Sequence, residues 1–235
     1  GFVFEMPCFG IDKAGRERIE VPVRPRKRSK GVCSGCGRRG STYDHLSERC
    51  FDYVPLWGIA VVLLYQMRRI DCPACGVKVE CVPFAAGKSP ISRSFALFLA
   101  DWAKVLSWQE TARRFRTNWH QVYTAVRYVV EWGLAQRELS GVSAIGIDEV
   151  HFGKGQAYLT VVYQLCGDVR RLLFVTQRND SAALEAIFEE AGKDWCLGIT
   201  HVCTDMWRAY RKVIEKRLLN AIHILDRFHI VKLLN

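Results

Sequence analysis

The sequence predicts an α+β protein built from several domains, and three observations lead to this prediction. Two matching Cys-x2-Cys-Gly motifs lie in a first part that is rich in strand-forming residues. Apolar residues then follow a helical period from Ser92 to Leu139. From Ser143 onward strand-like runs return, and two of them end at an aspartate. The expected domains are residues 1–82, 83–140 and 141–235.

The positive charge is concentrated in the first part of the chain. Residues 1–140 contain 22 Lys and Arg against 13 Asp and Glu, whereas residues 141–235 contain 12 against 11. A basic surface attracts polyanions, and nucleic acid is the commonest partner of that kind. The alternative is a charged surface that serves only solubility. The longest apolar run, Val54 to Tyr65, is too short to cross a bilayer and is interpreted as a buried strand.

Four of the ten cysteines are paired by their spacing. Cys33-Ser-Gly-Cys36-Gly and Cys72-Pro-Ala-Cys75-Gly each place two thiolates on one tight turn. Two such turns supply the four ligands of a closed tetrahedral Zn²⁺ site, so the sequence predicts structural zinc. Two disulfides in a secreted protein are the alternative interpretation.

The segment between the two motifs is longer than in a usual zinc ribbon. Its 35 residues must fold out as strands, and the runs around Val61 and Met67 suit that role. His45 lies in this segment and could replace one thiolate, although a lone histidine is more often an ordinary surface or core residue.

A basic stretch precedes the first cysteine motif. Pro22 and Pro25 are expected to keep it extended. An extended basic arm can lie along phosphates or enter a minor groove, and a solvated linker is an equally good interpretation. The candidate DNA contacts in this arm are Arg26, Lys27 and Arg28.

The helical part predicts three helices. The first is expected from Ser92 to Lys104. Ser107 followed by Glu110 is a capping-box sequence, which predicts a short helix that ends near Phe115. A three-residue turn then leads to a longer helix that runs to about residue 137. A short helix, a turn and a longer helix are typical of a helix-turn-helix, although many helical hairpins share this pattern without touching DNA.

The start of the longer helix is where base contacts are expected. Either of the two residues before it can act as the helix cap. The candidate base contacts are Asn118, His120 and Gln121, and the candidate phosphate contacts are Arg113, Arg114, Arg116 and Arg127. The side chains expected to turn inward are Val122, Val126, Val129 and Val130.

The last part of the chain predicts a layered α/β domain. Strands are expected at residues 143–150, 157–165, 170–177 and 199–205, with a helix at 181–192 and a fifth strand that closes at Asp226. Three strands, a helix and a fourth strand are the element order of a ribonuclease H-like domain. In a sheet of order 3-2-1-4-5 the first and fourth strands are neighbours.

Asp148 and Asp205 end the first and fourth of these strands. Adjacent strand ends would bring both carboxylates to one ion, and hard oxygen ligands suit Mg²⁺ or Mn²⁺. Two such metals activate an attacking hydroxyl and stabilise the leaving oxygen when nucleic acid is cut. A single aspartate at a strand end is more often a turn or helix cap. Glu149 is expected on the opposite face of its strand.

Several stretches resemble bacterial insertion-sequence transposases of the ISL-three family, which are DDE transposases with an N-terminal zinc finger. They occur in the family's order over almost the whole chain, and Asp-Arg-Phe-His-Ile is the most distinctive. The matching stretches are Cys33-x2-Cys36, Arg68-Arg-Ile-Asp-Cys-Pro-Ala-Cys75-Gly, Gly146-Ile-Asp-Glu149, Tyr158-Leu-Thr-Val-Val162, Asp205-Met-Trp207 and Asp226-Arg-Phe-His229-Ile.

The resemblance implies binding to terminal inverted repeats and to target DNA, cleavage by water, and strand transfer by a freed 3′ hydroxyl. It also implies a homo-oligomer on double-stranded DNA, in the cytoplasm and associated with the nucleoid. Asp148 and Asp205 are carried over as the first two acidic residues. The third, a glutamate on a helix beyond the fifth strand, would lie past Asn235. The catalytic domain is therefore expected to be C-terminally truncated, and the 235-residue chain is expected not to cleave DNA alone.

The resemblance leaves Asp226 and His229 as expected neighbours of the site. Two other functions remain compatible with the residues. A zinc-bearing helix-turn-helix protein with a non-catalytic ribonuclease H-like domain would keep its DNA binding without Asp148 and Asp205. A ribonuclease H-like nuclease or resolvase would cut branched DNA without preferring a terminal sequence.

Overall fold

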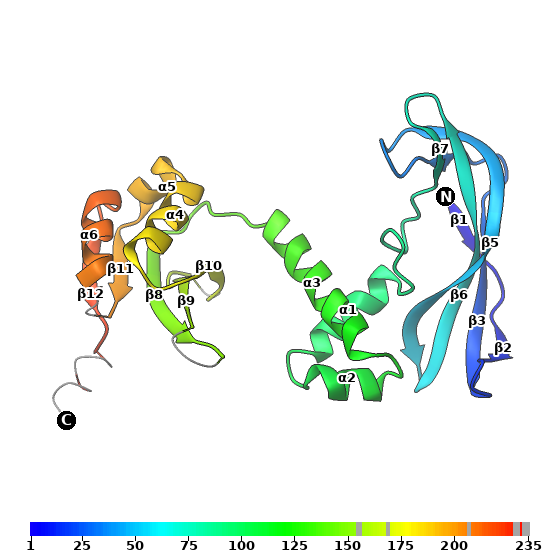
Figure 1. The fold of residues 1–235 in the computed structure, drawn as a ribbon, viewed down its shortest axis with the longest axis horizontal. Helices are drawn as coiled ribbons and strands as arrows, with labels where there is room; N and C mark the ends of the chain where they lie inside the picture. Colours follow the sequence, from blue (N-terminus) through cyan, green and yellow to red (C-terminus); the bar gives the residue numbers. More distant parts are fainter. Residues whose placement is uncertain (154–156, 168–169, 206–207, 228–230, 232–235) are drawn as a thin grey trace. The chain divides into compact units, whose positions relative to one another are not determined.

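The computed structural model describes residues 1–153, 157–167, 170–205, 208–227 and 231 (Figure 1). The chain divides into two compact units, residues 1–136 and 137–235. Within the described ranges, none of the helices has the length and apolar character needed to span a membrane.

A seven-stranded sheet forms most of the first unit. Its strands are β1 (Phe2–Phe4), β2 (Cys8–Ile11), β3 (Glu17–Pro25), β4 (Gly31–Val32), β5 (Arg39–Leu56), β6 (Ile59–Cys72) and β7 (Gly76–Val79). β6 is central, because it pairs parallel to β3 on one side and antiparallel to β5 on the other. Its nearly continuous apolar sequence is typical of a strand covered on both faces, which explains its burial.

The apolar run from Val54 to Tyr65 is two strands, so its interpretation as one strand was wrong. Trp57 and Gly58 form the turn between β5 and β6, with φ values of 51° and 81°. Positive φ at both central positions is the geometry of a two-residue hairpin turn. Asn-Gly is the usual signal for this turn, and Trp-Gly does not give it.

Three helices complete the first unit. They are α1 (Arg93–Trp102), α2 (Trp108–Arg114) and α3 (Trp119–Ala135). Ser107 and Glu110 form the predicted capping box at the start of α2. Asn118 caps α3, because its side-chain oxygen accepts a hydrogen bond from the Gln121 N–H at 2.9 Å. The predicted succession of a short helix, a turn and a longer helix is confirmed.

The inward face of α3 differs in part from the prediction. Val122 and Ala125 are fully buried, whereas Val130 is 53% exposed. Eight residues separate Val122 from Val130, and about 100° per residue places them roughly 80° apart around the helix. Val130 therefore leaves the buried stripe, and Ala125 takes the place expected for a valine.

The sheet and the helices pack as one unit, so no compact-unit boundary falls at the expected position between residues 82 and 83. The backbone of Asp52 on β5 joins the two parts. Its N–H donates to the Pro90 carbonyl and its carbonyl accepts from the Ser92 N–H, both at 2.8 Å. Since Ser92 is the N-cap of α1, these bonds fix the start of the helices on the sheet.

The described residues of the second unit form a five-stranded sheet and three helices. The strands are β8 (Ala144–His151), β9 (Tyr158–Gln164), β10 (Leu172–Gln177), β11 (His201–Thr204) and β12 (Ile222–Leu225). The helices are α4 (Ser181–Ala191), α5 (Lys193–Gly198) and α6 (Arg208–Arg217). The sheet order is β10-β9-β8-β11-β12, which confirms the predicted order 3-2-1-4-5. The short helix α5 was not predicted.

The helices of the second unit cover one face of its sheet. Ile145 and Ile147 on β8 and Val202 on β11 are buried there. The helical side chains in this core are Leu184, Ile187 and Phe188 of α4, Cys196 of α5, and Tyr210, Val213 and Ile214 of α6. The alternating residues of β8 and β11, including Gly146 and Cys203, face the other side of the sheet.

Candidate functional site

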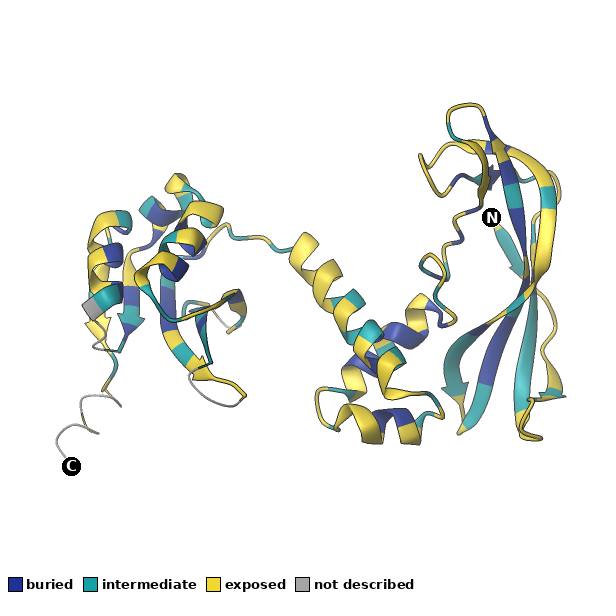
Figure 2. Ribbon diagram, viewed as in Figure 1, coloured by how far each residue is buried: buried dark blue, intermediate teal, exposed yellow. Residues whose placement is uncertain are grey.

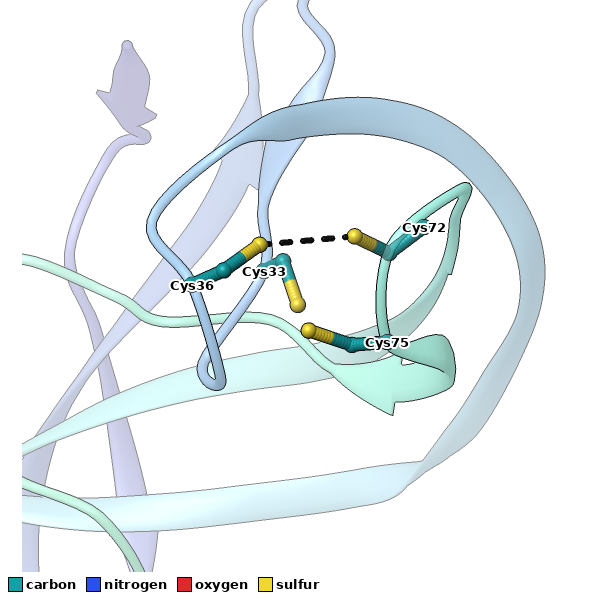
Figure 3. Close-up of side chains that lie close together, drawn as sticks. All are labelled: Cys33, Cys36, Cys72 and Cys75. Atoms are coloured by element: carbon teal, nitrogen blue, oxygen red, sulfur yellow. Dashed lines mark hydrogen bonds between the residues drawn. The ribbon is translucent and has the colours of Figure 1, made fainter.

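The four paired cysteines form one cluster in the first unit. Their sulfur atoms all lie within 4.8 Å of one another (Figure 3), and the Cys36 and Cys72 Sγ atoms are 3.5 Å apart. In a tetrahedral Zn²⁺ site with Zn–S bonds of about 2.3 Å, neighbouring sulfurs are roughly 3.8 Å apart. The donor set and its spacing therefore fit zinc. All ten cysteines, each within the described part of the chain, are free thiols.

The glycine after each Cys-x2-Cys pair makes the turn possible. Gly37 and Gly76 have φ values of 73° and 68°, a left-handed conformation that glycine adopts without strain. The Gly37 N–H donates to the Cys33 carbonyl at 2.9 Å, which closes the first turn. His45 pairs with Arg68 across the β5–β6 ladder and is not a member of the cluster.

Electrostatics within the cluster favour a bound cation. The hydrogen bond with the Cys36 sulfur, together with burial and the neighbouring Cys33, raises the pKa of Cys75 to about 12. The negative charge of a Cys75 thiolate would lie beside three other sulfur atoms, which disfavours it. A divalent cation offsets this charge, and thiolates are the form in which cysteine binds metal.

Two charged side chains next to the cluster have a structural role. Arg68 and Glu80 are 5% and 3% exposed, and the Arg68 Nη2 donates to the Glu80 Oε2 at 2.7 Å. Tyr65 donates its hydroxyl to the same carboxylate, and Arg68 Nη1 donates to the Ser29 carbonyl at 2.9 Å. Arg68 therefore holds the basic arm against the end of β6 and is not available to phosphates.

The predicted arm is extended only in its first part. Pro22 and Pro25 lie within β3, but the Ser29 N–H donates to the Arg26 carbonyl at 3.0 Å and closes a turn. Arg28 in this turn has a φ of 60°. The expectation of an extended arm was therefore wrong for residues 26–29, because no further proline or strand partner continues β3. The exposed cations of the turn are Arg26, Lys27 and Arg28.

The amide side chains at the start of α3 are already hydrogen-bonded. The side-chain oxygen of Asn118 accepts a hydrogen bond from the Gln121 N–H and caps the helix. The side-chain oxygen of Gln121 accepts a hydrogen bond from the Thr117 hydroxyl. His120 is exposed. Arg127 is exposed, and its Nε lies 3.6 Å from a carboxylate oxygen of Glu131. Among the described residues, no salt bridge engages the other exposed arginines near the turn, which are Arg113, Arg114 and Arg116.

Sequence reasoning missed the aromatic side chains of this region. Trp108 begins α2, and Trp119 begins α3 with Tyr123 one turn later. Figure 2 shows that much of α3 is exposed, and these three side chains are 39%, 55% and 37% exposed. Their positions at helix starts, outside the apolar stripe, were the available signal.

Three aspartates follow residues that are register partners on neighbouring parallel strands. The prediction that Asp148 ends its strand was wrong, because β8 continues to His151 through its pairing with β9. Thr204 on β11 pairs with Ile147 on β8 and with Leu225 on β12. The residues that follow these three are Asp205, Asp148 and Asp226. The Asp226 N–H donates to the Thr204 carbonyl at 2.8 Å, which extends the parallel pairing to that level. The structure thus places both predicted catalytic aspartates, and the predicted neighbour Asp226, at the same level along three adjacent strands.

Electrostatic interactions indicate that two of these carboxylates share a face. Burial raises the pKa of Cys203, and the negative charges of Asp226 and Asp148 raise it further. Cys203 lies between Gly146 and Ile224 in register, so its side chain faces the side that the helices leave open. Glu149 points to the other side, as predicted, where its Oε2 accepts from the Asn179 Nδ2 at 3.1 Å.

Gly146 lets an aromatic ring approach this face. A Cβ at Gly146 would lie 2.3 Å from the Tyr163 ring, so only glycine fits beside that ring. The pKa of Tyr163 is raised, mainly by burial and in second place by the negative charge of Asp148. His229, expected near the site, lies outside the described residues.

Comparisons with known proteins find similarity to transposases. The transposase model of the ISL-three (ISL3) family matches residues 145–235. The transposase for insertion sequence element IS1557 of Mycobacterium tuberculosis is 31% identical over 232 residues, which are 95% of this chain and 50% of that protein. Residues 145–235 thus match the transposase model of the ISL-three family, and the whole chain is similar to insertion-sequence transposases.

A second transposase extends the likeness. The transposase for insertion sequence element IS1001 of Bordetella parapertussis is 25% identical over 227 residues, which are 92% of this chain and 55% of that protein. The chain thus spans about half the length of the curated relatives it matches. A crystal structure of a pre-cleavage Mos1 transpososome matches 63% of this chain and 62% of that chain at 12% identity, with a TM-score of 0.19. A TM-score of this size supports no inference about the fold.

Proposed function

We propose that this chain belongs to a DDE transposase that moves an insertion sequence. In this proposal the first unit binds the terminal inverted repeats through its helix-turn-helix and basic turn. The second unit is the first part of a ribonuclease H-like domain that cuts and joins DNA strands, and the active form is a homo-oligomer on DNA. The match of residues 145–235 to the ISL-three transposase model and the similarity to the IS1557 transposase support this proposal at the level of the class of enzyme.

One observation carries the catalytic part of the proposal. Asp148 and Asp205 follow residues that are register partners on adjacent parallel strands. The backbones of the two aspartates therefore lie at the same level along these strands. Neighbouring strands lie about 4.8 Å apart, a spacing at which two carboxylates can bind one ion. Their oxygen atoms would hold Mg²⁺ or Mn²⁺. When bound, such ions activate the attacking hydroxyl and neutralise the charge that develops on the leaving oxygen.

The residues around the aspartates would position them. The Glu149 N–H donates to the Asp148 Oδ1 at 2.7 Å, which orients that carboxylate where the pairing of β8 with β11 ends. The face that bears Gly146 and Cys203 is not covered by α4, α5 or α6, so a DNA strand can approach it. Among the described residues, we propose only Asp148 and Asp205 as acidic ligands of the metal.

The zinc part of the proposal is structural. Cys33, Cys36, Cys72 and Cys75 use all four positions of a tetrahedral ion, so no position is left for water or substrate. The ion would clamp the end of β6 to the segment after β4.

The test of the catalytic part is Mn²⁺ binding to the 235-residue chain, followed by electron paramagnetic resonance. Asp148→Asn and Asp205→Asn should each weaken binding about tenfold or more, because each removes one charged ligand. Glu215→Gln, which removes an exposed carboxylate paired with Arg211 on α6, is the matched control and should not change Mn²⁺ affinity. Unchanged affinity in both aspartate variants would remove the basis for the metal site.

The rival function, DNA binding with a non-catalytic second unit, is separated by the same variants. In the full-length transposase, Asp148→Asn and Asp205→Asn should abolish excision of the element and leave binding to its ends unchanged. A protein whose excision survives both substitutions is not a DDE transposase.

A further inference from the structure

A strip of exposed rings follows the outer face of α3 and reaches the start of α2. We call the rings of Trp108, Trp119, His120 and Tyr123 the aromatic strip. The ring centroids of Trp119 and His120 are 5.8 Å apart, and those of His120 and Tyr123 are 6.3 Å apart. Trp108 continues the strip, since its ring lies 5.5 Å from that of Tyr123. Trp119 is the most exposed of the three larger side chains, at 55%.

An exposed aromatic cluster of this kind indicates an interaction surface. Exposing large apolar side chains to water is unfavourable in free energy. Contiguous apolar patches on a protein surface therefore usually mark a binding site. The buried stripe of α3 already provides the packing of the helix through Val122 and Ala125. The aromatic strip is therefore not needed for the helix core of this unit.

The charges around the aromatic strip favour a polyanion as its partner. Between residues 107 and 130 the chain has four arginines and one glutamate. That glutamate, Glu110, is engaged in the capping box with Ser107. The Arg127 guanidinium lies 5.7 Å from the centre of the Tyr123 ring, so one cation is held directly against the strip. A surface of rings bordered by guanidinium groups fits DNA, whose phosphates flank the apolar parts of the bases.

The hydrogen bonds at the start of α3 limit how bases can be read. Bidentate recognition of adenine needs both the oxygen and the nitrogen of an Asn or Gln amide. The oxygens of Asn118 and Gln121 already accept hydrogen bonds from the chain itself. The side chains at this helix start that remain outward are thus mainly the rings of Trp119, His120 and Tyr123.

We propose that α3 recognises double-stranded DNA through the 5-methyl groups of thymines, which Trp119 and Tyr123 contact in the major groove. The thymine methyl is the apolar group that the four base pairs present there, and it is the natural partner of an apolar ring. This inference rests on the proposed DNA-end binding of the first unit. It names Trp119 and Tyr123 as specificity-determining residues in place of the amides.

The experiment uses the 235-residue chain and a library of random DNA duplexes. The bound sequences are selected, and a consensus duplex is made in which each thymine in turn is replaced by deoxyuridine, which removes only the methyl group. We expect Kd to rise about fourfold for each contacted methyl that is removed, the loss that corresponds to one buried methyl-sized group. Trp119→Ala and Tyr123→Ala should each lose the response to uracil at the thymine that the removed ring contacts and keep it at the other.

Two variants control for effects on folding and on exposed aromatic residues in general. Trp132→Ala removes another exposed ring of α3, 57% exposed and outside the aromatic strip, and should keep the full response to uracil. Tyr123→Phe keeps the ring and should also keep the response. Circular dichroism spectra that match the unsubstituted chain establish that α3 is intact in each variant.

Each contrary outcome has a distinct meaning. Specific binding that is indifferent to uracil overturns thymine-methyl recognition and leaves the proposed DNA-end binding intact. Failure to select any consensus, or tighter binding to single strands, counts against both. If Trp119→Ala disrupts a protein oligomer and leaves Kd for the duplex unchanged, the aromatic strip is a protein interface and the inference is wrong.

Discussion

Asp148 and Asp205 follow Ile147 and Thr204, which are register partners on adjacent parallel strands. This relationship follows from the order of elements, because the chain returns to the sheet beside β8 after passing through β9, β10 and two helices. Register partners on parallel neighbours lie at the same level along their strands, although β8 itself continues to His151. Two aspartates 57 positions apart in the sequence are thereby brought to one level.

The position of Asp226 leads to the first prediction. Leu225, the residue before it, also pairs with Thr204, but on the far side of β11 from β8. Asp226 is therefore two strand spacings, about 10 Å, from Asp148. Since the attraction between charges falls with distance, Asp226→Asn should weaken Mn²⁺ binding by less than Asp148→Asn does. A loss equal to that of Asp148→Asn would make Asp226 a direct ligand.

The sequence predicted the sheet of the second unit because its signals are regular. Alternation and apolar runs define each strand, and the succession of elements leaves few possible orders. The cysteine cluster was predictable for a similar reason, since a Cys-x2-Cys-Gly turn fixes the geometry of two ligands locally. Both sites were therefore predictable from short segments of the sequence.

The features that were not predicted depend on contacts between distant residues. Arg68 is a basic residue in the sequence, and only the fold shows that Glu80 and Tyr65 surround its guanidinium. Asn118 and Gln121 read as base contacts until their hydrogen bonds within the chain are known. Residue type alone does not distinguish a side chain that binds a partner from one that binds its own backbone.

The cysteine cluster leads to a prediction about metal content. Cys36→Ser removes one of the four sulfurs and should lower both the zinc content and the melting temperature of the first unit, because metal binding adds directly to folding free energy. Cys50→Ser, which changes an exposed thiol on β5 outside the cluster, is the control and should retain one zinc per chain. Zinc content is measured by elemental analysis and melting by circular dichroism. Equal zinc in both variants would contradict a four-sulfur site.

The adjacent arginines of β6 allow a matched comparison of buried and exposed ion pairs. The Arg68 and Glu80 side chains are 6% and 0% exposed, whereas those of Arg69 and its partner Asp44 are 41% and 38% exposed. Arg68→Met leaves the Glu80 charge buried without its partner and should reduce the free energy of unfolding by about 3–5 kcal/mol. Arg69→Met should cost much less, because water already solvates that pair. Urea unfolding measures both, and similar losses would show that burial does not govern these pairs.

Asp180 leads to a prediction about acid stability. Its carboxylate accepts a hydrogen bond from the Ala183 N–H at 2.8 Å at the start of α4, and this bond, together with the nearby Arg178, lowers the pKa of Asp180 below its usual value of 3.8. A lowered pKa in the folded state means that the contribution is present above the unfolded pKa and is lost as pH falls through the folded value. Asn is also a good N-cap but does not titrate. Asp180→Asn should therefore make the denaturation midpoint of the second unit less dependent on pH below about 4.

The control for this prediction is Asp194→Asn, which changes an exposed aspartate in the first turn of α5. The Asp194 carboxylate does not cap α5, since that helix begins at Gly192 without a side-chain hydrogen bond. Its substitution should leave the acid dependence as steep as in the unsubstituted chain. The prediction is that the helix cap, and not the number of carboxylates, sets the acid dependence. If both variants reduce the pH dependence of the denaturation midpoint equally, net charge and not the Asp180 hydrogen bond controls stability in acid.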